Sequence, residues 1–221
     1  MSRRDFSAQL AQADKQLAKS GAMMRRLIKA HGPCTLAPAW KRSPFEALVR
    51  AIIYQQLHGR AAATILQRLI DLFPEAGFPS AQNLLEAPDA KLRGVGLSRQ
   101  KTGYLRDLAA KTEEGLVPLS RTALSRASDE EIIARFTQVK GIGRWTVEML
   151  LIFTLGRLDV LPVDDYGVRK GYTRADGRQT PVATGELRLL GEAWAPWRSV
   201  AAWYFWRASE DTQLKDPSRP K

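Results

Sequence analysis

Cysteine and histidine are scarce in this sequence, and their scarcity restricts metal and redox chemistry. The 221 residues include one cysteine, Cys34, and two histidines, His31 and His58. A single cysteine excludes an intrachain disulfide and an iron–sulfur cluster held by four thiolates. A zinc site built from these three residues would need an additional carboxylate and an unusual spacing. We therefore expect no metal site and no organic cofactor for chemistry.

Long apolar runs are also missing. The chain begins Met1-Ser2-Arg3-Arg4-Asp5, and no long hydrophobic stretch follows. Neither a secretory signal nor a transmembrane span is therefore expected. The interpretation is a protein that has no membrane partner and works in a reducing, cytosol-like compartment.

Sustained alternation of apolar and polar residues, the pattern of half-buried strands, is absent as well. The pattern is helical almost throughout and predicts an all-α protein. The length and a hydrophobic content of 44% favour one globular body or two intimately joined lobes. The segment 174–184 is expected to be an exposed loop, and the aromatic segment 194–207 a buried closing helix.

Local signals predict where the first helices begin and break. Ser43 is expected to be an N-cap, with Pro44 at the first helical position and Glu46 closing a capping box. The polar and basic segment 3–30 predicts a helix or a helix pair that Gly21 breaks.

Basic residues outnumber acidic ones. Lys and Arg total 34 against 23 Asp and Glu, giving a formal charge of +11 and a pI near 10.1. This balance favours a polyanionic partner, because a basic protein releases condensed counterions when it binds nucleic acid. A merely soluble basic surface explains the charge equally well.

One short pattern occurs twice. Residues 92–96 and 139–143 both read apolar, basic, Gly, apolar, Gly, and each lies between helical segments. Two copies are too few for a solenoid, so the interpretation is two similar hairpins in one body. Neither hairpin follows a strand, which argues against a dinucleotide-binding fingerprint or a P-loop.

Helices are expected on both sides of the second hairpin. Ser128 and Glu131 predict a capping box that opens a short helix running to about Gln138. The segment from Arg144 to Leu155 is apolar on nearly every face, which predicts a buried helix.

The glycines of the second hairpin suit a phosphate group. Gly141 and Gly143 would let the backbone turn tightly and approach a ligand closely. The following helix N-terminus offers free N–H groups, and Lys140 and Arg144 add positive charge. An ordinary helix-to-helix turn with a glycine C-cap is the alternative.

Two adjacent acids follow the segment that begins at Leu161-Pro162. Asp164 is placed to be the N-cap of the next helix, and Asp165 would then lie in its first turn. Capping alone could explain both acids.

Taken together, these motifs resemble a known family, the helix-hairpin-helix DNA glycosylase superfamily, and within it the 3-methyladenine DNA glycosylase II group. The similarity rests on Val139 to Thr146, on Leu161 to Tyr166 and on Pro196 to Ser199. The segment 45–57 is similar to the family's DNA-wedge region. The resemblance covers roughly 43–207, most of the chain.

The resemblance implies a fold of known type. We expect a two-lobed, all-α helical bundle forming a single domain over residues 1–221. Residues from about 44–160 would form the central lobe with its hairpin, and 1–43 plus 161–221 the second lobe. No amino-terminal β domain fits, because the helical match begins early, so we expect the compact form of the fold.

The resemblance also implies roles for the paired acids. Asp165 matches the family's catalytic carboxylate, and Asp164 the structural, capping acid. An anion beside the sugar would stabilise the oxocarbenium character that develops as the bond between a purine and deoxyribose breaks. The same group would orient or deprotonate the attacking water.

Aromatic residues of this chain match the family's base pocket, where stacking and cation–π attraction suit a cationic alkylated purine. These matches are Trp145, Tyr166 and Trp206, although Trp206 could equally be a core residue. Relatives that also cleave the strand use a lysine at the position of Trp145, so a monofunctional enzyme is expected. Met149 stands where some members place a pocket tyrosine.

DNA contacts follow from the same comparison. Gln56 matches the wedge position, where other members use leucine, and His58 would lie near the minor groove or be a neutral surface histidine. Lys140 replaces a common hairpin proline. The first hairpin, with Arg99 and Lys101, resembles a second backbone-contacting turn or is a plain C-cap. Expected DNA-binding residues are Gln56, His58, Gly94, Gly96, Lys140, Gly141, Gly143, Arg144 and Thr146.

The function implied is excision of 3-methyladenine-like or 7-methylguanine-like bases from double-stranded DNA by a monomer. The enzyme would work in the cytoplasm with the chromosomal DNA, or in the nucleus of a eukaryote, and a monovalent cation in the hairpin remains an open question. A second hypothesis is a DNA-binding module that keeps the hairpin and has lost catalysis. A third is a glycosylase for oxidised or mismatched bases.

Overall fold

The structure is a computed structural model that describes residues 3–211, and within that range it is helical with no strand. The predicted all-α class is confirmed. Contacts divide the chain into two compact units, which we call unit 1 (Met1–Pro38 and Gly156–Lys221) and unit 2 (Ala39–Leu155). No helix among the described residues is long and apolar enough to span a membrane.

Unit 1 combines the first two described helices with the last three. Its helices are α1 (Arg3–Ser20), α2 (Ala22–His31), α10 (Tyr166–Ala175), α11 (Thr184–Leu190) and α12 (Arg198–Glu210). A short 3₁₀ turn, Gly191–Trp194, precedes α12.

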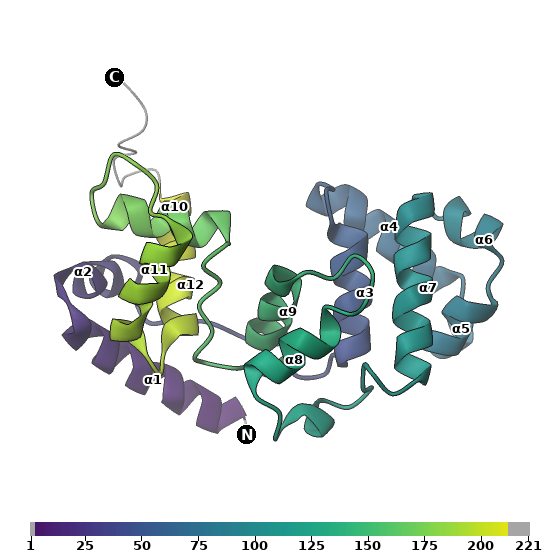
Figure 1. Cartoon of the computed structure of the whole chain (residues 1–221), viewed down its shortest axis with the longest axis horizontal. Coiled ribbons are helices and arrows are strands. Elements are labelled where there is room, and N and C mark those ends of the chain that lie inside the picture. The colour runs from purple at the N-terminus through teal and green to yellow at the C-terminus, as the bar shows by residue number, and fades with distance from the viewer. Residues whose placement is uncertain (1–2, 212–221) are drawn as a thin grey trace. The chain divides into compact units, whose positions relative to one another are not determined.

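The α10 and α12 helices of unit 1 pack closely (Figure 1). A Cβ at Gly171 of α10 would overlap the backbone carbonyl of Phe205 in α12, so glycine permits this approach. Tyr172 and Trp194 pack on the Phe205 ring, with centroids 5.5 and 4.9 Å away. This contact places the first turn of α10 beside the last turns of α12.

Unit 2 has its own apolar core. It contains α3 (Pro44–Tyr54), α4 (Gly59–Asp71), α5 (Ala81–Glu86), α6 (Asp89–Gly94), α7 (Arg99–Glu113), α8 (Asp129–Phe136) and α9 (Arg144–Leu150). A π-helical turn, Leu151–Leu155, extends α9. The α7 helix lies against both α3 and α5 (Figure 1).

Most predicted helix boundaries in the first half are confirmed. The N-terminal pair breaks at Gly21, and the Ser43 hydroxyl accepts a hydrogen bond from Glu46 N–H at 3.0 Å. The predicted capping box at this end is wrong, because the Glu46 carboxylate binds Arg50 at 2.9 Å. The box between Ser128 and Glu131 is present.

Three predictions in the second half need correction. The segment 144–155 is not wholly buried, since Trp145 is 47% and Phe153 36% exposed. The closing helix begins at Arg198, and Trp194 belongs to the preceding 3₁₀ turn. The loop expected at 174–184 begins after Ala175, where α10 ends, and buries Val182.

Candidate active site

The first acid of the pair does not cap the helix as predicted. Asp165 is the N-cap of α10, and its Oδ1 accepts the Val168 N–H at 2.8 Å. The Asp165 N–H donates to the Pro162 carbonyl at 3.0 Å and closes a turn. Asp164 lies within this turn as a loop residue. The helix therefore starts one residue later than expected, and Asp164 is exposed.

A second donor reaches the same oxygen from α12. The Trp206 indole N–H lies 2.8 Å from Asp165 Oδ1. Asp165 is only 9% exposed, and Trp206 is half-buried. The two donors fix the orientation of the carboxylate, so Trp206 is placed beside the acid that the family comparison makes catalytic.

Gly167 makes room for this contact, and sequence reasoning missed it. A Cβ at Gly167 would lie 2.8 Å from Trp206 Cδ1 and 3.1 Å from Asp165 Oδ1. The available signal was a glycine in the first turn of a helix, where most other residues form helix better. Tyr166, directly before it, is 76% exposed and begins α10.

Four of the site residues predicted for unit 2 line one cavity of about 570 Å³, whereas His58, Gly94, Gly96, Lys140, Gly143 and Arg144 do not. Gln56 contributes from the turn between α3 and α4, and Lys101 from α7. Gly141, Trp145 and Thr146 contribute from the second hairpin and α9. Thr146 is buried, so it forms part of the cavity wall and is not on the exposed surface of the hairpin.

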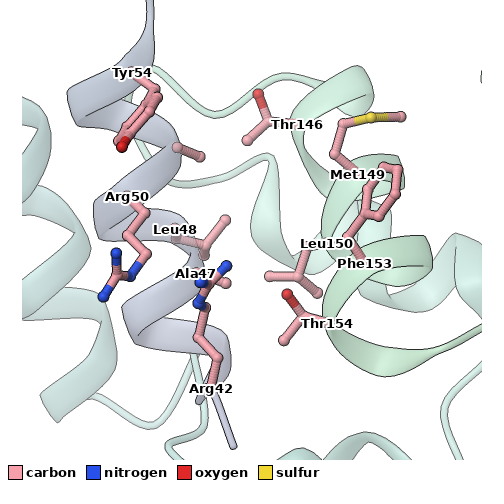
Figure 2. A pocket seen from close by; sticks show the side chains of 11 residues that line it. Arg42, Ala47, Leu48, Arg50, Tyr54, Thr146, Met149, Leu150, Phe153 and Thr154 are labelled. Carbon is pink, nitrogen blue, oxygen red and sulfur yellow. The ribbon is translucent and has the colours of Figure 1, made fainter. Parts of the chain in front are cut away.

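A second hollow, of about 280 Å³, lies between α3 and the α9 segment. Tyr54, Thr146 and Met149 line both hollows. Figure 2 shows Arg42 and Tyr54 on one side and Met149 on the other. Burial, together with neighbouring Arg50, lowers the pKa of Arg42. The resulting surface beside Trp145 is largely apolar, with cations at its edge.

The hairpin turn is held in place by unit 2 itself. Gly141 has φ +79°, and a Cβ there would overlap the Tyr104 ring. Its carbonyl accepts the Gln55 side-chain amide at 2.8 Å. Gly143 differs, because it is the N-cap of α9 with φ −97° and no atom lies within 4 Å of an added Cβ. Gly141 is thus the structural glycine, while Gly143 leaves open space before a helix N-terminus.

The two basic residues of the hairpin are in different situations. The Lys140 side chain is 74% exposed and 3.8 Å from Asp107. The Arg144 guanidinium binds Glu130 and, at 3.1 Å, Glu148. These ion pairs raise the pKa of Arg144, with the Glu130 hydrogen bond as the largest cause. Lys140 therefore projects toward solvent, whereas Arg144 would have to exchange carboxylate partners to meet a phosphate.

Asp107 of α7 anchors the start of the hairpin. Its Oδ2 accepts the Lys140 backbone N–H at 2.8 Å and the Lys111 ammonium at 3.0 Å. Burial acts to raise the pKa of Asp107, but these donors and the nearby positive charges outweigh burial, and the pKa is lowered. A charged Asp107 thus fixes the chain just before Gly141.

The predicted wedge turn is exposed. Gln56 and His58 are both exposed between α3 and α4, and His58 is the N-cap of α4 without a side-chain capping bond. Leu57, which the sequence analysis did not single out, is 39% exposed on the same turn. Three side chains with different chemistry thus project where the wedge is expected.

The first hairpin lies between α6 and α7. Gly94 ends α6, and Gly96 has φ +108° with the Ile65 side chain 3.0 Å from an added Cβ. Lys101, which the sequence placed near the DNA backbone, instead donates to the carbonyls of Ile53 and Gln55, both at 2.7 Å. Burial lowers its pKa.

The part of the chain that the structure describes contains no set of side chains suited to bind a metal ion. Over residues 3–211 there is no group of three or more His, Cys, Asp or Glu side chains that could hold a metal ion.

A short turn with two glycines between α8 and α9, followed by an acid at the start of α10, defines a helix-hairpin-helix protein. Residues 49–196 match the family described as HhH-GPD superfamily base excision DNA repair protein. The chain belongs to this superfamily.

Relatives with known names narrow the assignment. DNA-3-methyladenine glycosylase 1 of Schizosaccharomyces pombe is 38% identical over 215 residues, covering 96% of this chain and 93% of that protein. An alkylbase DNA glycosidase-like protein of the same yeast is 32% identical over 196 residues, covering 88% of this chain and 92% of that protein.

Solved structures agree with this grouping. The S. pombe 3-methyladenine DNA glycosylase, in complex with abasic DNA, has a TM-score of 0.83 and 36% identity. The match covers 92% of this chain and 99% of that one. A Bacillus halodurans DNA-3-methyladenine glycosidase has a TM-score of 0.82 and 32% identity, covering 93% of each chain.

Proposed function

We propose that this protein is a monofunctional DNA glycosylase that removes alkylated purines, such as 3-methyladenine and 7-methylguanine, from double-stranded DNA. The observation that carries the proposal is the Asp165 carboxylate, held by Val168 N–H and Trp206 N–H at the start of α10. Support also comes from relatives named as a DNA-3-methyladenine glycosylase and a DNA-3-methyladenine glycosidase, and from a 3-methyladenine DNA glycosylase structure that holds abasic DNA.

The reaction breaks the bond between C1′ of the sugar and the purine nitrogen. The bonding electron pair leaves with the base, and an alkylated purine that already carries positive charge departs as a neutral molecule. Positive charge develops on the sugar at the same time, and the Asp165 anion stabilises it. A water oxygen then bonds to C1′ and its proton passes to the carboxylate or to solvent. The product is an abasic site.

Recognition of the base requires aromatic surfaces, because a flipped purine has lost its stacking partners. Tyr166 and Trp145 are exposed at 76% and 47% and offer faces for stacking and cation–π attraction. Trp206 contributes its N–H to Asp165 as well as its ring. Since Trp145 has no amine that could form a Schiff base, the enzyme leaves the strand intact.

DNA binding uses the exposed turns of unit 2. Lys140 and the open backbone at Gly143 meet the phosphate groups, and Gln56 enters the space left by the flipped base, with His58 and Leu57 beside it. We propose that the protein acts as a monomer where the chromosome lies, in the cytoplasm or in a eukaryotic nucleus.

Incubation with methylated duplex DNA tests this function. We expect free 3-methyladenine and 7-methylguanine by chromatography, and strands that stay intact until hot alkali is added. Borohydride should trap no covalent complex. Tight duplex binding without base release would instead establish the non-catalytic binding protein, and release of oxidised or mismatched bases alone would establish a different substrate class.

A further inference from the structure

Lys101 lies near the start of α7 and reaches the end of another helix. Its ammonium donates to the carbonyls of Ile53 and Gln55, both at 2.7 Å. These carbonyls belong to the last turn and the C-cap of α3, where helix carbonyls lack intrahelical partners. Within residues 3–211 the ammonium makes no ion pair with a carboxylate, so its interactions are with this turn.

The residue after Gln55, whose carbonyl Lys101 binds, has an unusual backbone conformation. Gln56 has φ +55°, and it is the non-glycine residue with positive φ in the described part of the chain. Residues with a Cβ avoid this region unless their surroundings hold them there. Lys101 binds the carbonyl of Gln55, which forms the peptide bond to Gln56, and thereby restrains the conformation that aims the Gln56 side chain.

The same face of α7 holds the hairpin. Tyr104, Asp107 and Lys111 follow Lys101 at intervals of three and four residues and therefore share one stripe of the helix. The Tyr104 ring packs on Gly141, and Asp107 binds the Lys140 N–H at 2.8 Å.

Lys111 completes the stripe. Its ammonium donates to the Gln138 carbonyl and to Asp107. A direct bond also joins the two turns, since the Gln55 amide donates to the Gly141 carbonyl at 2.8 Å. One face of α7 thus fixes both the wedge turn and the hairpin within unit 2.

We propose that Lys101 is a positioning residue for base extrusion, acting through the backbone of Gln56 rather than by contacting a DNA phosphate. This inference rests on the proposed glycosylase function. It predicts that loss of the Lys101 ammonium leaves duplex binding nearly unchanged and slows the step in which the base is flipped and held.

The test compares Lys101→Met with Lys91→Met, which removes an equal charge from an exposed position on α6. Single-turnover excision should fall roughly ten- to a hundred-fold for Lys101→Met, since small misplacements of positioning groups have effects of this size. The Kd for unmodified duplex should match that of Lys91→Met. Lys101→Arg, which keeps cationic donors, should retain most of the excision rate and guards against a simple folding defect.

A double-mutant cycle with Gln56→Ala identifies the route of the effect. If Lys101 acts through Gln56, the double variant loses little more than Gln56→Ala alone. Additive losses would overturn the proposal, as would a weaker Kd for unmodified duplex with a salt slope lowered by about 1, the signature of a phosphate contact.

Flipping can be followed without catalysis. A 2-aminopurine at the target position reports unstacking by its fluorescence, and we expect a smaller rise with Lys101→Met than with wild type or Lys91→Met. Equal rises would contradict the positioning role. Because this readout needs no base release, a failure of the glycosylase assignment remains distinguishable from a failure of this inference.

Discussion

Asp165 Oδ1 is shared by two hydrogen bonds, one that starts α10 and one that comes from α12. The sequence identified the acid through its neighbours but exchanged the capping position with Asp164. The error arose because either acid of an adjacent pair can cap a helix, and the turn after Pro162 decides which one does. The indole bond joins residues 41 positions apart, and local pattern does not predict it.

Gly167→Ala tests the importance of the indole bond. The new Cβ, 2.8 Å from Trp206, should displace the ring from Asp165 and reduce excision by about ten-fold or more. The free energy of unfolding should change by no more than about 1 kcal/mol. The better helix propensity of alanine, about 1 kcal/mol relative to glycine, offsets the cost of moving the ring. Single-turnover rates and thermal unfolding measure the two effects.

Gly185→Ala is the matched control, because Gly185 is also the second residue of its helix and no atom lies within 4 Å of an added Cβ. It should leave excision unchanged. Wild-type excision by Gly167→Ala would show that the contact between Trp206 and Asp165 is dispensable.

Elements were predictable where short-range chemistry decides them. The capping box at Ser128 is present as expected. At Ser43 the box is missing, because the Glu46 carboxylate binds Arg50, four residues further along the same helix. Choice between two nearby partners depends on side-chain geometry that a motif does not contain. Long-range contacts such as Lys101 with the end of α3 were beyond the same reasoning, because they depend on how helices pack.

The second hairpin separates two kinds of glycine. Gly141→Ala should lower the free energy of unfolding by at least about 1–2 kcal/mol, since its φ is +79° and the Tyr104 ring occupies the Cβ position. Gly143→Ala should lower the free energy of unfolding by about 1 kcal/mol, because alanine is a poorer N-cap than glycine. It should also weaken duplex binding, because the new Cβ would lie in front of the N-terminus of α9. Denaturant unfolding and duplex titration check both.

A larger loss of stability in Gly143→Ala than in Gly141→Ala would contradict this division. Unchanged DNA affinity in Gly143→Ala would show that the DNA does not approach the backbone closely at Gly143.

At the scale of the whole molecule, the absence of alternating patterns and the basic composition pointed to an all-α protein with a polyanionic partner. Both features depend on sums over many residues, so single errors of boundary or capping do not alter them. The charge of +11 suits a DNA duplex, but charge does not select a lesion. Specificity must come from the few groups near the flipped base.

On this mechanism one anion, Asp165, drives the excision. Asp165→Asn keeps one oxygen that can accept from Val168 and Trp206, removes the negative charge and replaces the other carboxylate oxygen by an NH2 group. Single-turnover release of 7-methylguanine from duplex DNA should fall by roughly a hundred-fold or more in this variant, with duplex affinity within about two-fold of wild type. Equal release by the two proteins would show that the Asp165 charge does not drive the reaction.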